Sequence, residues 1–170
     1  MWWTPFYNFA MRLFEWGLQI KGWWNKETRG WNQLRARHLI QLDTIRKEAE
    51  DKELVWMHCA SLGEFEQGKP VIEAIRKDYP AFKIVLTFFS PSGYKQKKKD
   101  PVADYVFYLP LDGPLSAKKF IQLVKPHAVF FVKYEFWHFY IYYLRQQKIP
   151  CYYFSCIFRP SQAFFQFYGR

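Results

Sequence analysis

Two carboxylate side chains follow short apolar segments of this sequence and could accept a proton from a hydroxyl group. Glu64 follows Ser61 and Gly63, and Glu135 stands two residues after Lys133. A hydroxyl is a poor nucleophile until a base takes its proton in the transition state, and a positioned carboxylate can act as that base. Gly63 would let the backbone turn tightly and let a substrate approach. These residue types suit carbohydrate chemistry.

Each carboxylate also has an ordinary structural interpretation. Ser61 and Glu64 have the Ser-x-x-Glu spacing of a capping box, in which the two residues bond to each other's backbone at a helix start. Glu135 could pair with Lys133 and hold its own loop. Spacing alone favours the cap for Glu64 and the ion pair for Glu135.

Other polar side chains could hold anions. Ser90, Ser92 and Gly93 precede or begin a predicted helix, whose N-terminus can bind an anion, although an ordinary N-cap is the simpler interpretation. Lys133 and Arg159 could bind phosphate or carboxylate groups. The sequence has no P-loop, no GxGxxG motif and no metal-ligand spacing of histidines, so it predicts no metal site and no nucleotide binding by those motifs.

The elements that must position these residues form an alternating pattern from residue 53 onward. Short, nearly continuous apolar runs alternate with amphipathic segments, which is typical of parallel strands covered on both faces. The pattern predicts an α/β fold with a Rossmann-like parallel sheet and helices on both faces. The predicted strands are Leu54–Cys59, Lys83–Phe88, Tyr105–Leu109, Ala128–Val132 and Cys151–Ser155, and the predicted helices lie near 65–78, 92–99, 115–125 and 137–148.

The loops after these strands should meet at one rim of the sheet, because ligands of open parallel sheets bind beyond the carboxyl ends of the strands. We expect this rim to contain five charged residues. They are Glu64, Asp112, Lys133, Glu135 and Arg159.

Residues 1–52 are predicted to form an amino-terminal unit of two amphipathic helices, near 2–24 and 31–50. The chain contains 8 Trp, 12 Tyr and 18 Phe and has a formal charge of +10. Aromatic rings suit a membrane–water interface and basic residues suit anionic headgroups, so we favour membrane association over packing of the first helix on its own domain. The sequence contains no run of 18 uncharged apolar residues, so it predicts no membrane-spanning helix. Three cysteines without CxxC spacing fit a reducing cytoplasm.

Two non-enzymatic functions remain open at this point. The basic and aromatic composition is also compatible with a non-catalytic module that binds membrane surfaces. A nucleic-acid-binding domain fits the charge, but the acidic residues expected at the rim oppose it.

Five segments in a fixed order carry a more specific signal: HCASLGEFEQG at 58–68, LTFFSPSGY at 86–94, YLPLD at 108–112, FVKYEFW at 131–137 and FRPSQ at 158–162. Together they resemble the 3-deoxy-D-manno-octulosonic acid (Kdo) transferases, glycosyltransferase family 30, over about residues 54–170. The resemblance implies a GT-B architecture, in which two Rossmann-like domains face a cleft, and makes residues 53–170 the acceptor-binding domain.

The family's activity implies an inverting transfer of Kdo from CMP-Kdo to a lipid A precursor (lipid IVA) during lipopolysaccharide core synthesis. No cofactor and no catalytic metal are implied. The donor domain is expected to follow and is absent from this chain, so the chain alone is expected to be inactive. The implied partners are the lipid acceptor, CMP-Kdo through the missing domain and the cytoplasmic side of the bacterial inner membrane, with no nucleic acid.

The resemblance also implies roles for individual residues. The family's catalytic base is the Glu of its Ser-x-Gly-Glu segment, which falls on Glu64, and its Lys-x-Glu segment brings Glu135 to the cleft. The residues expected to bind the acceptor are Ser61, Gly63, Ser90, Ser92, Lys133, Glu135 and Arg159.

Overall fold

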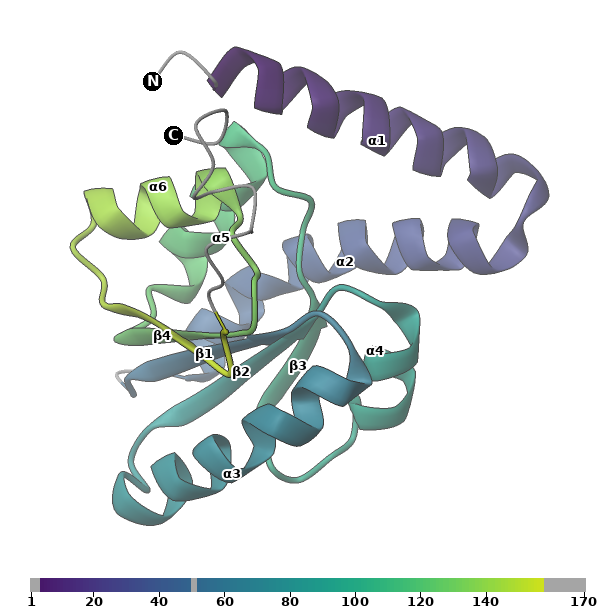
Figure 1. Cartoon of the computed structure of the whole chain (residues 1–170). Coiled ribbons are helices and arrows are strands. Elements are labelled where there is room, and N and C mark those ends of the chain that lie inside the picture. The colour runs from purple at the N-terminus through teal and green to yellow at the C-terminus, as the bar shows by residue number, and fades with distance from the viewer. Residues whose placement is uncertain (1–3, 50–51, 158–170) are drawn as a thin grey trace.

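A computed structural model describes residues 4–49 and 52–157, without the side chains of residues 43–46 (Figure 1). Within these residues, two long helices precede a regular alternation of strands and helices. The elements are α1 (Thr4–Trp24), α2 (Lys26–Glu48), β1 (Leu54–Cys59), α3 (Leu62–Asp78), β2 (Lys83–Phe88), α4 (Pro91–Lys97), β3 (Tyr105–Tyr108), α5 (Pro114–Val124), β4 (Ala128–Val132), α6 (His138–Gln146) and β5 (Cys151–Phe154).

The five strands form one parallel sheet in the order β3-β2-β1-β4-β5. The predicted Rossmann-like sheet is therefore confirmed. Strands β1, β2 and β4 have the predicted bounds, while β3 and β5 each end one residue earlier than predicted. Central β1 is buried along its whole length because neighbouring strands and both helical layers cover it.

Successive residues of β1 point into two separate cores. Leu54 and Trp56 join the core shared with α2, α5 and α6, whereas Val55 and Met57 join the core shared with α3 and α4. This alternation follows from the two-residue period of a strand. The Trp56 ring is fully buried and lies against aromatic rings from three elements. They are Phe120, Phe131 and Tyr140, with ring centroids 4.8, 5.3 and 5.5 Å away.

Helix α1 forms an outer layer that lies along α2 (Figure 1). The Tyr7 hydroxyl donates a 2.6 Å hydrogen bond to Asp112, and the Asn32 amide of α2 donates to the Leu18 carbonyl of α1 at 3.0 Å. The face turned away from α2 exposes six large apolar side chains at helical spacing, here called the outer stripe of α1. They are Phe6, Phe9, Leu13, Trp16, Ile20 and Trp23.

Although α1 has an apolar face, it does not meet the requirements for a membrane-spanning helix. Among residues 4–49 and 52–157, no helix combines the length and the hydropathy that crossing a bilayer requires.

Close packing between α4 and β2 depends on a glycine. Gly93 is buried in the first turn of α4, and a Cβ at this position would collide with the Phe88 ring. We expect Gly93→Ala to lower the free energy of unfolding by about 1–3 kcal/mol because the Phe88 ring must shift. The matched control is Gly63→Ala in the first turn of α3, where a Cβ meets open space. This control should be neutral or stabilising by up to about 1 kcal/mol in urea denaturation, and equal losses in both variants would contradict the packing explanation.

Candidate functional site

The sheet has its switch point between β1 and β4. From β1 the chain runs through α3 on one face, whereas from β4 it runs through α6 on the other face. Connections that diverge in this way leave a crevice at the carboxyl ends of the two strands, where open α/β sheets bind ligands. Glu64 follows β1 and Glu135 follows β4. The topology therefore places both carboxylates at the edge where a ligand is expected.

Glu64 lies in the first turn of α3 and forms the capping box that its spacing indicates. The Ser61 backbone N–H donates to the Glu64 carboxylate at 3.0 Å, and the Glu64 backbone N–H donates to the Ser61 hydroxyl at 3.4 Å. The cap fixes the carboxylate at the start of α3, beside the crevice. A role as base is compatible with this contact and stays a prediction.

Glu64 is also influenced by the charges of the opposite loop. Partial burial raises its pKa above the ordinary value for a glutamate, and the negative charge of Glu135 raises this pKa further. The backbone N–H groups of Ser61 and Ala60 and the charge of Lys133 act in the lowering direction. The structure therefore brings Glu64, Glu135 and Lys133 into one electrostatic group.

The expected ion pair between Lys133 and Glu135 is not formed among the described residues, and the partner of Glu135 is a buried histidine. The Nε2 atom of His58 lies 3.6 Å from a Glu135 carboxylate oxygen, and His58 itself is fully buried in β1. His58 belongs to β1 and Glu135 follows β4, and these two strands lie side by side in the sheet. The contact between these two residues takes the place of the expected pair between Lys133 and Glu135. Lys133 instead has a left-handed backbone with φ of 65°, which is uncommon outside glycine and clusters at functional sites.

A short chain of polar contacts orients the His58 ring. The Trp56 Nε1–H donates to the Thr87 hydroxyl oxygen at 2.8 Å, and Thr87 lies 2.8 Å from His58 Nδ1. Because the Thr87 oxygen already accepts from Trp56, its own O–H can donate to Nδ1, which leaves the ring hydrogen on Nε2 facing Glu135. The sequence pattern assigns no role to His58, because its spacing from the other histidines does not fit a metal site. The sequence feature that could have indicated a role for His58 is its place as a lone ionisable residue at the carboxyl end of an apolar strand.

Two buried donors face this region without a hydrogen-bond partner in the part of the chain that the structure describes. They are His58 Nε2 and Trp137 Nε1, whose rings lie 6.4 Å apart. Trp137 also stacks on Phe89 at a centroid distance of 5.2 Å. Both nitrogen atoms are shielded from solvent, and buried polar atoms without a partner are uncommon in folded proteins.

The serines after β2 act at the helix start. Ser90 is the N-cap of α4 and accepts a hydrogen bond from the Gly93 N–H at 3.5 Å, while its hydroxyl lies 3.0 Å from that of Ser92. The Ser90 N–H donates to the Ala60 carbonyl at 2.8 Å, which ties this loop to the segment before Glu64. The N-cap interpretation is therefore sufficient for Ser90.

Two expectations about this edge were wrong, and one lies outside the described residues. Gly63 has a helical backbone with no positive φ, so it does not form the expected tight turn. Asp112 does not point to the rim: it is 1% exposed and accepts from Tyr7 and from the N–H groups of Phe139 and Tyr140 at 3.1 and 3.2 Å. It therefore caps α6, whose first N–H groups have no partner within the helix. Arg159 lies outside the described residues.

This fold and site define a Rossmann-like α/β domain with two carboxylates at the carboxyl edge of its sheet. Residues 32–167 match the family described as 3-deoxy-D-manno-octulosonic-acid transferase (kdotransferase). The chain belongs to this family.

Several curated proteins named 3-deoxy-D-manno-octulosonic acid transferase are similar to the chain. The protein of Aquifex aeolicus is 37% identical over 99 residues, which are 58% of this chain and 27% of that relative. The protein of Haemophilus influenzae is 36% identical over 98 residues, 56% of this chain and 23% of the relative. The protein of Chlamydia muridarum is 33% identical over 111 residues, which are 64% of this chain and 25% of that relative. The chain thus spans about a quarter of the length of these relatives.

Proposed function

We propose that this chain is the acceptor-binding half of an inverting GT-B glycosyltransferase that moves Kdo from CMP-Kdo to a lipid A precursor such as lipid IVA. The observation that carries the proposal is the convergence of Glu64 and Glu135 at the switch point of the sheet, in a chain of the kdotransferase family. A second domain of the complete enzyme would supply the donor site.

Glu64 would act as the base of this reaction. It would accept the proton of an acceptor hydroxyl while the hydroxyl oxygen forms a bond to the anomeric carbon of Kdo. The bond from that carbon to CMP breaks, CMP leaves with the electron pair, and the configuration inverts. Burial and Glu135 raise the pKa of Glu64, which makes its carboxylate a stronger base than an exposed glutamate.

The neighbours of Glu64 would complete the acceptor site. His58 would hold Glu135 in place, so that Glu135 can accept a hydrogen bond from a second acceptor hydroxyl. Lys133 would place its charge beside an acceptor phosphate. Ser61, Ser90 and Ser92 would line the same edge, Gly63 would leave room for the acceptor to approach, and Arg159 is proposed as a further phosphate ligand.

The pH dependence of transfer tests this arrangement, because a base works only when it is deprotonated. Activity should fall as the pH drops through the raised pKa of Glu64. Glu135→Gln removes a charge that raises this pKa, so the acidic limb should move to lower pH. Lys133→Met removes a charge that lowers the pKa, so the limb should move to higher pH.

The measurement is kcat/KM for Kdo transfer against pH in the complete enzyme. The two variants serve as controls for each other, because each removes one charge from the same edge. Shifts in the same direction, or an unchanged acidic limb in both, would show that the pKa of Glu64 does not control the reaction.

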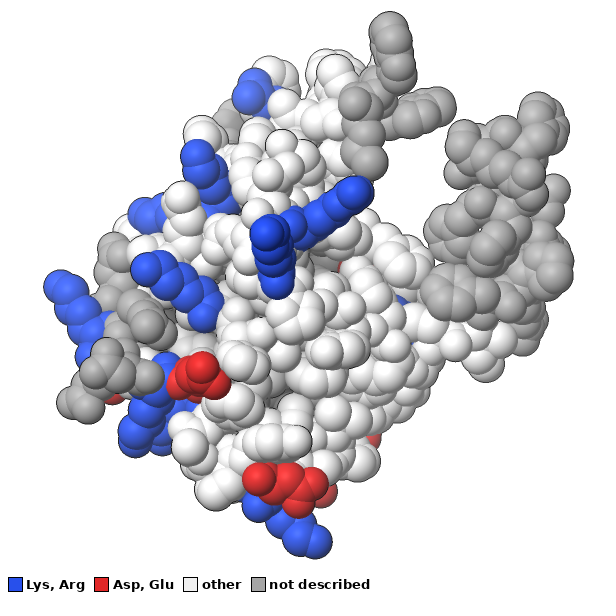
Figure 2. Space-filling view, turned by 90° about the vertical axis from the view of Figure 1, so that its left-hand side faces the viewer, with Lys and Arg blue, Asp and Glu red and all other residues white. Residues whose placement is uncertain are grey.

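We further propose that α1 lies in the interface of the bacterial inner membrane on its cytoplasmic side. The proposal is supported by the outer stripe of α1, which is exposed while the opposite face of the helix packs on α2. The formal charge of +10 would add attraction to anionic headgroups, and Figure 2 shows basic side chains over one side of the molecule. The same stripe supports a second candidate, a membrane-binding module without catalysis, which predicts no Kdo transfer by the complete protein.

Replacing Phe9 and Trp16 together with glutamate should release the chain from anionic vesicles. Burial of each ring contributes about 1.5–3 kcal/mol, so the double variant should bind roughly a hundredfold more weakly. Flotation with vesicles measures the effect. The matched control is Ile40→Glu, which places a charge at an exposed apolar residue of α2. Equal binding by the double variant and the control would exclude α1 as the membrane contact.

A further inference from the structure

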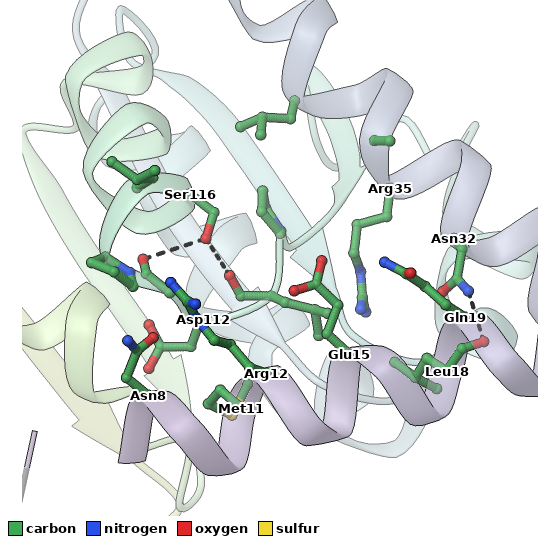
Figure 3. A pocket seen from close by; sticks show the side chains of 17 residues that line it. Asn8, Met11, Arg12, Glu15, Leu18, Gln19, Asn32, Arg35, Asp112 and Ser116 are labelled. Carbon is green, nitrogen blue, oxygen red and sulfur yellow. Dashed lines mark hydrogen bonds between the residues drawn. The ribbon is translucent and has the colours of Figure 1, made fainter. Parts of the chain in front are cut away.

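A pocket lies apart from the carboxylates, between α1, α2 and the loop that follows β3 (Figure 3). Its volume is about 490 Å³, enough for a small polar group and part of its carrier. Of the described residues, neither Glu64 nor Glu135 lines it. The proposed sugar transfer makes no use of this space.

Arg35 of α2 is the reason to expect a ligand in this pocket. It lines the pocket and is 6% exposed, and its Nε and Nη1 atoms have no hydrogen-bond partner within the described residues. Nη2 makes one long contact of 3.4 Å to the Phe89 carbonyl. Burial lowers the pKa of Arg35 to about 10, so the guanidinium remains charged at neutral pH. A buried charge without a partner is costly, and its natural complement is an anion.

The Arg35 guanidinium lies against two aromatic rings, which shield it from solvent. The Arg35 Cζ atom lies 3.9 Å from the Trp31 ring centroid and 4.6 Å from that of Phe89. The two rings are nearly perpendicular to each other, at 79°, so they enclose the guanidinium from two sides. Arginine presents paired donors that match the oxygens of a phosphate.

The other polar residues of the pocket are mixed in charge. Asn8, Gln19 and the guanidinium of Arg12 can donate hydrogen bonds, whereas Glu15 opposes an anion. Figure 3 shows Arg35 and Glu15 extending from α2 and α1 into the same space. No ion pair within 4.0 Å joins them among the described residues, although the negative charge of the exposed Glu15 side chain acts to raise the pKa of Arg35. The Asp112 carboxylate is occupied by its three hydrogen bonds.

We infer that this pocket binds a phosphate group through the Arg35 guanidinium, which lines the pocket and has two nitrogen atoms without a hydrogen-bond partner among the described residues. The phosphate can belong to a lipid headgroup at the membrane surface or be free in solution, because both present the same oxygens. This inference is independent of the sugar transfer proposed for the carboxylate edge.

The first experiment measures binding of inorganic phosphate to the purified chain by calorimetry, at constant ionic strength. Arg35→Leu should weaken binding about tenfold or more, the loss expected for a charge-assisted hydrogen bond. Arg37→Leu is the matched control, because it removes an exposed charge of the same helix outside the pocket, and it should bind normally. Ala36→Phe keeps Arg35 but fills the pocket, and should also abolish binding. It serves as the test if Arg35→Leu fails to fold.

A second arm replaces inorganic phosphate with vesicles that contain phosphatidic acid, again comparing Arg35→Leu with Arg37→Leu. If Arg35→Leu but not Arg37→Leu loses binding of inorganic phosphate, the pocket is a site for free phosphate. If Arg35→Leu loses only the binding of vesicles, the pocket is a site for a lipid headgroup. Glu15→Gln should strengthen binding in whichever arm responds, because it removes the opposing charge. The inference is overturned if neither arm distinguishes the two arginine variants. It is equally overturned if Glu15→Gln weakens binding and destabilises the chain, since Glu15 would then be the partner of Arg35.

Discussion

Replacing Glu64 with glutamine should reduce Kdo transfer by the complete enzyme about 10²–10⁴-fold, the usual contribution of a general base. The amide cannot accept the proton of the acceptor hydroxyl. Its carbonyl oxygen can still accept from the Ser61 N–H, because glutamine is also a capping-box residue. The fold should therefore survive, with an unchanged melting temperature. Single-turnover kinetics with lipid acceptor and CMP-Kdo would measure the chemical step directly.

The matched control for this variant is Ser61→Ala. It removes the hydroxyl that caps the Glu64 N–H and should cost about 1 kcal/mol of stability while keeping the carboxylate. We expect its transfer rate to stay within about tenfold of the original enzyme. If Glu64→Gln turned over at a near-normal rate, the base would be another group. If Ser61→Ala lost as much activity as Glu64→Gln, the cap rather than the proton transfer would explain the effect.

Asp112→Ala is expected to cause the largest loss of stability, about 3 kcal/mol or more in the free energy of unfolding. The buried carboxylate accepts from the Phe139 and Tyr140 N–H groups at the start of α6 and from the Tyr7 hydroxyl of α1. Alanine leaves two buried N–H groups without partners, at about 1–3 kcal/mol each. It also removes one of the contacts that hold the amino-terminal end of α1, while the contact between Thr4 and His138 at 3.2 Å would remain. Chemical denaturation followed by circular dichroism measures the loss.

Tyr7→Phe separates the two consequences of losing Asp112. It removes only the contact from α1, so stability should fall by about 1 kcal/mol, the usual net contribution of one hydrogen bond. Hydrogen exchange should then show faster opening of α1 with α6 unchanged. An Asp112→Ala variant no less stable than Tyr7→Phe would mean that the carboxylate does not stabilise the start of α6.

The strands of this protein could be predicted closely from its sequence. Leu54–Cys59, Lys83–Phe88 and Ala128–Val132 have the predicted bounds because parallel strands covered on both faces leave uninterrupted apolar runs. Helix ends were harder to locate. Predicted helix 65–78 begins at Leu62 in the structure, because the cap is formed by Ser61 and the first turn contains the polar Gly63-Glu64 segment.

The candidate site was only partly predictable. Glu64, Glu135 and Asp112 all follow strands, and their positions in the sequence do not distinguish the inward side chain from the outward ones. The docking of α6 decides this difference, because its unpaired N–H groups attract Asp112 into the core. Likewise, nothing near residue 135 indicates that its partner is His58, which comes from a neighbouring strand far away in the chain.

The sequence was sufficient to predict the parallel α/β fold, the position of Glu64 and Glu135 at one rim of the sheet and the capping box at Ser61. These follow from hydrophobic periodicity and short-range spacing, which act within a few residues. The tertiary packing sets the strand order and its switch point, brings His58 to Glu135, buries Asp112 and leaves two nitrogen atoms of Arg35 without a hydrogen-bond partner among the described residues. Such contacts join residues separated by many positions, and their geometry exists only once the helices have packed on the sheet.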